Sequence, residues 1–159
     1  MSTTLNVLSI GPGVAIQDLG RPGAMANGLT RGGAADVLAV HEGAALLRQS
    51  HELACLEMVG FGGSFEAQDD MRIALTGAQM KANIDGTAVA WNASHSLPKG
   101  SVLNIGGTLS GTYGYLHVGG GIDTAPIMGA RATHLSSGFG RLVATGDTLP
   151  IGRDGGHGT

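Results

Sequence analysis

The densest group of chemically capable side chains lies in the segment Gln17-Asp18-Leu19-Gly20-Arg21-Pro22-Gly23. An amide, a carboxylate and a guanidinium occur there within five positions, and the glycines and the proline hold the backbone in a fixed, non-helical course. The planar guanidinium of Arg21 matches a carboxylate or a phosphate-like group. Two interpretations are open: a turn in which Asp18 and Arg21 pair and join two strands, or part of a substrate site.

A second unusual segment, Gly119-Gly120-Gly121-Ile122-Asp123, follows a short apolar run at residues 115–118. Three glycines leave the backbone without side chains, so their N–H groups could form an anion-binding nest or an oxyanion site. The same lack of side chains could instead admit a crossing strand. Ten residues after Gly121, Arg131 supplies a second planar cation, with the Thr133 hydroxyl nearby.

Two further polar residues stand in apolar surroundings. Glu57 lies inside a hydrophobic run, where a carboxylate is expected to be paired or to favour its neutral form. Arg21 or Arg131 could pair with it, or the period-two alternation of a strand could turn Glu57 to solvent. Thr76 and Gly77 end another apolar run, where a glycine either lets a ligand approach the backbone or forms an ordinary turn.

Other residue types give less specific signals. The six histidines form no recognised metal-ligand spacing with another histidine, a cysteine or an acid, so no metal site is predicted. No Walker-type phosphate loop occurs, so nucleotide binding would need an atypical site or another chain. Cys55 is the single cysteine, which excludes an internal disulfide, and its apolar neighbours predict a buried, inert thiol.

The composition predicts a mostly β fold. Glycine accounts for 29 of the 159 residues, against a usual share of about 7%, and 42% of the residues are hydrophobic. Many glycines between short apolar runs are typical of an all-β barrel with tight turns. One helix is predicted within residues 34–49, where an apolar stripe recurs at Val37, Val40, Ala44 and Leu47.

Short strands are predicted over most of the remaining chain. They span residues 5–9, 53–59, 64–67, 71–76, 80–84, 87–91, 101–105, 113–118 and 148–151. Asp85 and Gly86 separate two of these strands and favour a two-residue hairpin turn. No repeat or linker divides the chain, so we expect one domain over residues 1–152 and a flexible tail at residues 153–159.

Charge and hydropathy limit the partners of the protein. The net charge of -3 argues against a nucleic-acid or anionic-membrane partner. The first residues lack the basic region and the apolar core of a secretion signal, and no apolar run reaches the roughly 20 residues of a membrane helix. We therefore expect a soluble, cytoplasmic protein.

Several segments, taken in order, resemble the carboxyltransferase subdomain A and B family, also called the allophanate-hydrolase-subunit-2 or urea-amidolyase-related family. The matching segments are LSIGPGVAIQDLGRPG (8–23), GGAAD (32–36), LEMVGFGG (56–63), IALTGA (73–78), YLHVGGGID (115–123), PIMGARATHL (126–135) and GDTLPIG (146–152). The chain departs from the family pattern at Ala35, where the family usually has methionine, and at Ala132, where a hydroxyl is lost. The resemblance implies a cyclophilin-like β-barrel with one main helix, and a chain that forms the N-terminal half of a longer unit.

For function, the resemblance implies a component of an enzyme that processes a small amide, lactam or urea-like substrate. The family includes the C subunit of 5-oxoprolinase and part of the urea carboxylase carboxyltransferase domain. ATP or carboxybiotin is implied for the assembled enzyme, with neither bound directly by this chain. A protein like the B subunit of 5-oxoprolinase is the implied partner, and a homo-oligomer is a second option. The alternative is a non-catalytic regulatory or binding subunit that partners a kinase-inhibitor-like protein.

The resemblance also implies roles for the individual polar and glycine residues. Arg21, Arg131 and backbone N–H groups would stabilise charge on carbonyl or carboxylate oxygens, and proton transfer would fall to Asp18, Glu57 or Asp123. The predicted substrate-binding residues are Gln17, Thr76, Gly77, Gly119, Gly120, Gly121 and Thr133. We expect the two glycine-rich segments to meet at one end of the barrel; the opposing hypothesis is that each stabilises only its own turn.

Overall fold

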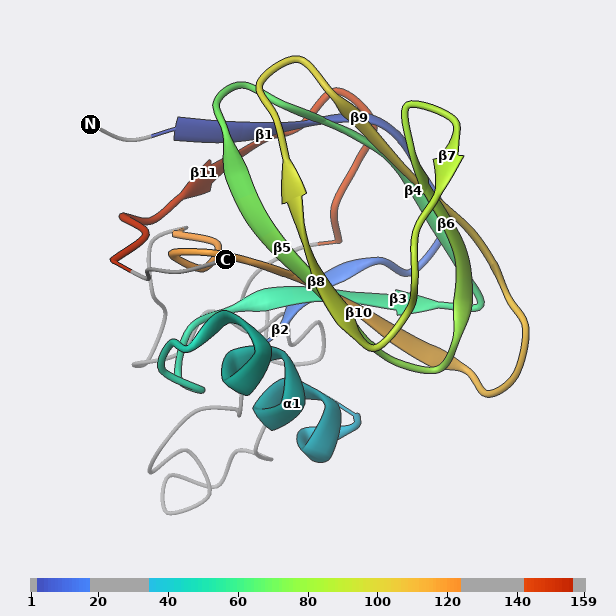
Figure 1. The fold of residues 1–159 in the computed structure, drawn as a ribbon. Helices are drawn as coiled ribbons and strands as arrows, with labels where there is room; N and C mark the ends of the chain where they lie inside the picture. Colours follow the sequence, from blue (N-terminus) through green and yellow to red (C-terminus); the bar gives the residue numbers. More distant parts are fainter. Residues whose placement is uncertain (1–2, 18–34, 124–141, 156–159) are drawn as a thin grey trace.

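The computed structural model describes residues 3–17, 35–123 and 142–155, and this part of the chain forms eleven strands and one helix (Figure 1). Six strands form one antiparallel sheet in the order β11-β1-β4-β9-β6-β7, and five form a second in the order β2-β3-β10-β5-β8. The helix α1 spans Val37–Leu47. The strands are β1 (Thr3–Ile10), β2 (Ala15–Gln17), β3 (Cys55–Val59), β4 (Phe61–Ala67), β5 (Met71–Gly77), β6 (Met80–Ile84), β7 (Thr87–Ala88), β8 (Ala93–Leu97), β9 (Val102–Thr108), β10 (Tyr113–Val118) and β11 (Thr148–Ile151).

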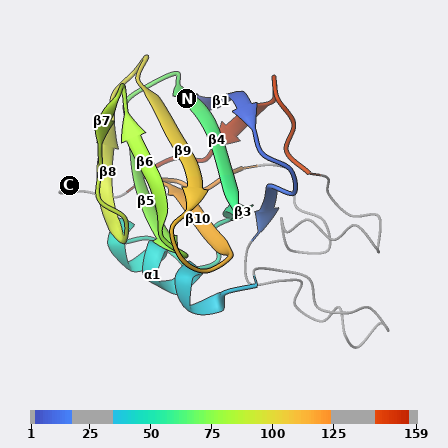
Figure 2. The ribbon, with the colours of Figure 1, turned by 90° about the vertical axis from the view of Figure 1, so that its right-hand side faces the viewer.

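The main hydrophobic core lies between the two sheets. Successive side chains of a strand point to opposite faces, so each sheet turns one set of side chains inward. Val7 and Phe65 from the six-stranded sheet and Leu75 and Leu116 from the five-stranded sheet belong to this core, and each is at most 2% exposed. The helix α1 packs against β5 and β10 from outside the space between the sheets (Figures 1 and 2). The five-stranded sheet is therefore covered on both faces.

The predicted fold class, mostly β with one main helix, is confirmed for the described residues. Their strand pairings form two open sheets rather than one closed barrel. The edge strand β7 has only two residues and pairs with β6, while the edge strand β8 pairs with β5. These two strands are not paired with each other, which leaves the two sheets separate at that edge.

The helix begins and ends within the predicted range. Asp36 is the N-cap, and its carboxylate accepts a hydrogen bond from the Ala39 N–H at 3.0 Å. Arg48 ends the helix in the left-handed region with a φ of 55°, and its N–H donates to the Ala45 carbonyl. In the described part of the chain, no helix is long and apolar enough to cross a membrane.

The buried face of α1 differs from the predicted stripe at one position. Val37 is 49% exposed, because the sheet at this end is contacted by the backbone of Ala35 and Asp36 instead of by the Val37 side chain. Gly43 lies on the buried face, in contact with the sheet. The buried residues of the helix are Ala39, Val40, Gly43, Ala44 and Leu47.

Replacing Asp36 with Ala removes the N-cap and is expected to lower the free energy of unfolding by about 1 kcal/mol. Asp36→Asn keeps a side-chain oxygen that can accept the same hydrogen bond, so it is the matched control and should cost much less. Chemical denaturation of both variants at neutral pH measures the difference. Equal losses would show that Asp36 does not act through this hydrogen bond.

The predicted hairpin turn joins β6 and β7. Asp85 and Gly86 have φ values of 50° and 87°, as in a type I′ turn, and Ile84 pairs with Thr87 across the turn. The sequence pattern does not predict β2 or β8, because β2 has only three residues and β8 has the sequence ASHSL, with weak hydrophobic alternation.

Candidate functional site

The helix-covered face of the five-stranded sheet carries most of the buried polar side chains of the described residues. Gln17, Glu57, Thr76 and His117 are each at most 7% exposed, and all four belong to this sheet. Cross-strand pairing brings Glu57 opposite Tyr115, and Tyr115 opposite Thr76. Gln17 and His117 each lie two residues along their strands from this row, and therefore on the same face. A polar layer thus separates α1 from the sheet.

Glu57 and Tyr115 form the centre of this polar layer. The Tyr115 hydroxyl donates to Glu57 Oε2 at 2.5 Å, and the same oxygen accepts from the Ala35 N–H at 2.7 Å. The Asp36 N–H donates to the Tyr115 hydroxyl oxygen at 2.9 Å. Burial, together with the hydrogen bond to Glu57, raises the pKa of Tyr115, so the hydroxyl stays protonated and available as a donor. The pair therefore fixes the backbone at the start of α1.

Glu57 is thus paired, as one of the interpretations of the sequence predicts. The solvent-facing alternative is wrong, because Glu57 is only 7% exposed. Its partners among the described residues are a tyrosine hydroxyl and a backbone N–H, whereas Arg21 and Arg131 lie outside the described residues. These contacts hold the backbone before α1 in place against β3. The catalytic role of Glu57 stays a prediction.

Thr76 and His117 form a second polar contact beneath α1. The Thr76 hydroxyl donates to the Ala39 carbonyl at 2.9 Å, and its oxygen lies 2.7 Å from His117 Nε2. A hydroxyl has one hydrogen, and the carbonyl oxygen must receive it, so His117 Nε2 carries a hydrogen and donates to Thr76. Burial lowers the pKa of His117 to about 4, which keeps the ring neutral at pH 7. The role of Thr76 in substrate binding stays a prediction.

The three glycines after β10 pack against the chain's own C-terminal segment. An added Cβ at Gly119 would overlap the Asp154 carboxylate, and one at Gly120 would overlap the Gly152 carbonyl. The N–H groups of Gly119, Gly120 and Gly121 donate to Arg72 O, Gln49 Oε1 and Val118 O. These donors are therefore used within the chain, which favours the crossing-strand interpretation over an anion-binding nest.

Gly77 and Asp123 also make contacts within the fold. Gly77 has a φ of 79°, and an added Cβ would lie 2.6 Å from the Tyr113 carbonyl oxygen, so a glycine is needed for the close approach of β10. The Asp123 N–H donates to the Pro150 carbonyl at 2.7 Å. The proposed chemical roles of both residues stay predictions.

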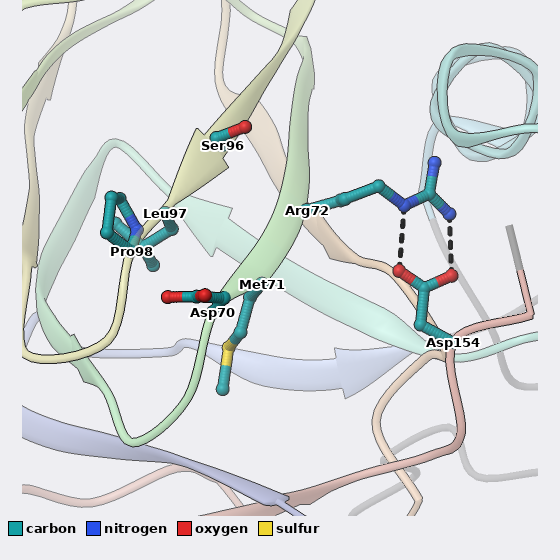
Figure 3. A pocket seen from close by; sticks show the side chains of 7 residues that line it. All are labelled: Asp70, Met71, Arg72, Ser96, Leu97, Pro98 and Asp154. Atoms are coloured by element: carbon teal, nitrogen blue, oxygen red, sulfur yellow. Dashed lines mark hydrogen bonds and ion pairs between the residues drawn. The ribbon is translucent and has the colours of Figure 1, made fainter. Parts of the chain in front are cut away.

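Arg72 and Asp154 form a bidentate ion pair that no sequence pattern indicates (Figure 3). Arg72 Nε and Nη2 each lie 2.7 Å from a carboxylate oxygen of Asp154, and Nη1 donates to the Leu47 carbonyl at the end of α1. The hydrogen bond to Asp154 raises the pKa of Arg72. The pair borders a cavity of about 360 Å³ that Asp70 and Ser96 also line. Asp154 belongs to residues 153–159, which the sequence predicts to be a flexible tail. Its ion pair with Arg72 shows that contacts with the fold continue past residue 152.

The segment 18–34, which contains Asp18 and Arg21, joins the described fold beside β3 at both of its ends. It follows Gln17, which pairs with Cys55 of β3. It precedes Ala35, whose N–H donates to Glu57 of the same strand.

The segment 124–141, which contains Arg131 and Thr133, joins the fold in the same region. The Ile122 N–H donates to the Ala54 carbonyl just before β3, and Leu142 forms a bridge to Ala15 of β2. The junctions of both segments therefore surround β2 and β3. Asp18, Arg21, Arg131 and Thr133 themselves lie outside the described residues, so their meeting in one site stays a prediction.

Comparison with known proteins identifies the family of this chain. Residues 27–159 match the family described as carboxyltransferase domain, subdomain A and B, and this match covers most of the chain. The chain belongs to this family.

Two curated relatives are C subunits of 5-oxoprolinase. The one from Escherichia coli (strain K12) is 33% identical over 153 residues, which is 94% of this chain and 49% of that protein. The one from Haemophilus influenzae is 29% identical over 154 residues, or 94% of this chain and 50% of that protein.

Among solved structures, the urea amidolyase of K. lactis superposes on this carboxyltransferase-family chain with a TM-score of 0.90. The identity is 24%, over 93% of this chain and 9% of that chain, so this likeness shows the fold alone. The chain spans about half the length of the curated relatives it matches.

Three residues of this carboxyltransferase-family chain, Tyr115, His117 and Arg72, carry polar contacts that were not expected from the sequence. Tyr115 and His117 alternate with apolar residues in β10, and this period-two pattern could have placed both on one face. Arg72 has no such signal, because its partner Asp154 is 82 residues away. Within the described ranges, no group of three or more His, Cys, Asp or Glu side chains is arranged to hold a metal ion. The prediction that the whole chain has no metal site stays a prediction.

Proposed function

We propose that this carboxyltransferase-family chain is one component of an ATP-dependent enzyme of the 5-oxoprolinase type, which processes a small cyclic amide. The observation that carries the proposal is the 33% identity to the C subunit of a 5-oxoprolinase across 94% of the chain. Because that relative is named as a subunit, the chain is proposed to work with other polypeptides. The sequence has no Walker-type loop, so ATP is proposed to bind to a partner subunit.

Opening a cyclic amide places negative charge on the carbonyl oxygen and requires a proton for the leaving nitrogen. Cationic side chains and N–H donors stabilise such charge, and a carboxyl group close to the nitrogen can deliver the proton. In the proposed site, Arg21 and Arg131 hold the substrate carboxylate and the carbonyl oxygen. Asp18 or Asp123 moves the proton.

The contacts around β3 support a site in this region. Glu57 and Tyr115 hold the N–H groups of Ala35 and Asp36, which directly follow the segment that contains Asp18 and Arg21. In this proposal Glu57 positions that segment and does not exchange protons with the substrate. Glu57→Gln keeps an oxygen that can accept both hydrogen bonds, so this variant is expected to retain turnover, whereas a catalytic base would lose it.

Reconstitution of the full chain with the other subunits of a 5-oxoprolinase tests the proposal, with 5-oxoproline-dependent ATP hydrolysis as the measurement. We expect hydrolysis that requires this chain and that falls in Arg21→Lys, because lysine keeps the charge and loses the planar guanidinium. Arg153→Lys changes an exposed arginine and is the matched control. This control should leave hydrolysis unchanged.

Three results would contradict the proposal or one of its assignments. Stable binding to a kinase-inhibitor-like protein without any hydrolysis would support the regulatory alternative instead. Turnover with urea and a carboxylated biotin carrier, and none with 5-oxoproline, would support a carboxyltransferase. A fall in the melting temperature of Arg21→Lys that accounts for its loss of activity would identify Arg21 as a structural clamp.

A further inference from the structure

The outer face of the six-stranded sheet carries a polar cavity that the proposed function does not use. The cavity has a volume of about 290 Å³ and is lined by residues of β4, β6 and β9, which are neighbours in the sheet (Figure 2). Ser64, Asn104 and Asn83 form a cross-strand row in its lining. Their neighbours Phe65 and Leu103 point into the core, so this row points away from the core.

One backbone N–H determines the orientation of the side chains in this row. The Gly86 N–H lies 3.1 Å from the Asn83 amide, so the atom of Asn83 that faces it must be the acceptor Oδ1. The Asn104 amide lies 3.0 Å from the same oxygen and must turn its Nδ2 toward it. Asn104 Oδ1 is then free to accept from the Ser64 hydroxyl at 2.6 Å. The NH₂ group of Asn83 is left with its two N–H donors unused by the described residues.

The cavity offers donors and positive charge. Among the described residues, Lys81 forms no ion pair and no acidic side chain lines the cavity. Phe61, which is 48% exposed, adds an apolar wall. A single cation beside neutral amide donors matches a monoanion, and hydrogen bonds from a charged donor to a carboxylate are among the strong ones. An exposed aromatic ring suits the organic part of such a ligand.

We propose that this cavity binds the carboxylate of a small organic molecule. The carboxylate oxygens accept hydrogen bonds from Lys81 Nζ and Asn83 Nδ2, and the organic part lies against Phe61. A phosphate dianion fits less well, because one lysine supplies the only positive charge among the described lining residues. The proposal does not depend on the proposed function, since the cavity lies on the six-stranded sheet and the site around β3 lies on the other sheet.

Titration of the isotope-labelled full chain with sodium benzoate tests this site, with the side-chain amide NMR signals of Asn83 and Asn104 as the measurement. Benzamide has the same ring without the charge, and inorganic phosphate has charge without the ring. We expect saturable shifts with benzoate and weaker binding of both other probes. Lys81→Gln should weaken benzoate binding roughly fivefold. Lys99→Gln changes an exposed lysine outside the cavity and should leave the affinity unchanged.

Asn83→Asp provides a second, structurally conservative variant. The new carboxylate still accepts from the Gly86 N–H and from Asn104, but it removes both donors and adds a negative charge. Benzoate binding should be lost while the melting temperature stays close to that of the parent chain. The proposal is overturned if benzoate causes no saturable shift, if Lys81→Gln and Lys99→Gln bind equally well, or if phosphate binds more tightly than benzoate.

Discussion

Replacing Gly43 with Ala is expected to lower the free energy of unfolding by about 2 kcal/mol, although the same change in an open helix stabilises by up to about 1 kcal/mol. Gly43 lies on the buried face of α1, and an added Cβ would overlap the imidazole of His117. The ring is held in place because its Nε2 bonds to Thr76 and because it is only 4% exposed. The helix must therefore move outward, and this loss of packing outweighs the gain in helix propensity.

A matched substitution and a double variant isolate the cause of this loss. In Gly107→Ala the added Cβ meets only the Gly60 carbonyl oxygen at 3.8 Å, which is an ordinary contact, so this control should cost little. In the His117→Ala background the ring is absent, and Gly43→Ala should be neutral or stabilising. Chemical denaturation of the four chains measures the coupling. The same loss in both backgrounds would show that the imidazole is not the obstacle.

The elements that the sequence predicts are those specified by local chemistry. The helix α1 lies within the residues that carry the predicted apolar stripe, and the Asp85-Gly86 turn joins β6 to β7, because each of these features depends on residues only a few positions apart. Strand β8 depends instead on its pairing with β5 along the sequence ASHSL, which has little hydrophobic pattern of its own. The separation of the two sheets likewise follows from which strands pair, and local sequence does not determine it.

In the candidate site, too, some features follow from neighbouring residues in the sequence, and others depend on residues far away in the sequence. The apolar neighbours of Glu57 predict that its carboxylate is paired, but the Tyr115 hydroxyl comes from 58 residues away. The glycines at 119–121 allow two interpretations, and only the position of Gly152 and Asp154 against them favours the crossing strand. Gly43 belongs to the same group, because its need for glycine comes from His117 on a different element.

Lowering the pH from 6.5 to about 4 is expected to remove about 3 kcal/mol of stability through His117. Burial lowers the pKa of this ring from 6.5 to about 4 in the folded chain. Between these two values the unfolded chain binds a proton at His117 and the folded chain does not, so protons favour unfolding. The contribution of the neutral ring is therefore fully present above pH 6.5 and is lost as the pH falls through the folded pKa.

The variant His117→Gln separates this contribution from the titration of other groups. Its amide N–H can still donate to the Thr76 hydroxyl oxygen, and it does not titrate. The parent and the variant differ at this position alone, so the difference between their unfolding free energies cancels the pH dependence of all other groups to first order. The free energy of unfolding of the parent chain, taken relative to that of the variant, is expected to fall by about 3 kcal/mol between pH 7 and pH 4. A difference that stays constant over this range would contradict the lowered pKa of the buried imidazole beneath Gly43.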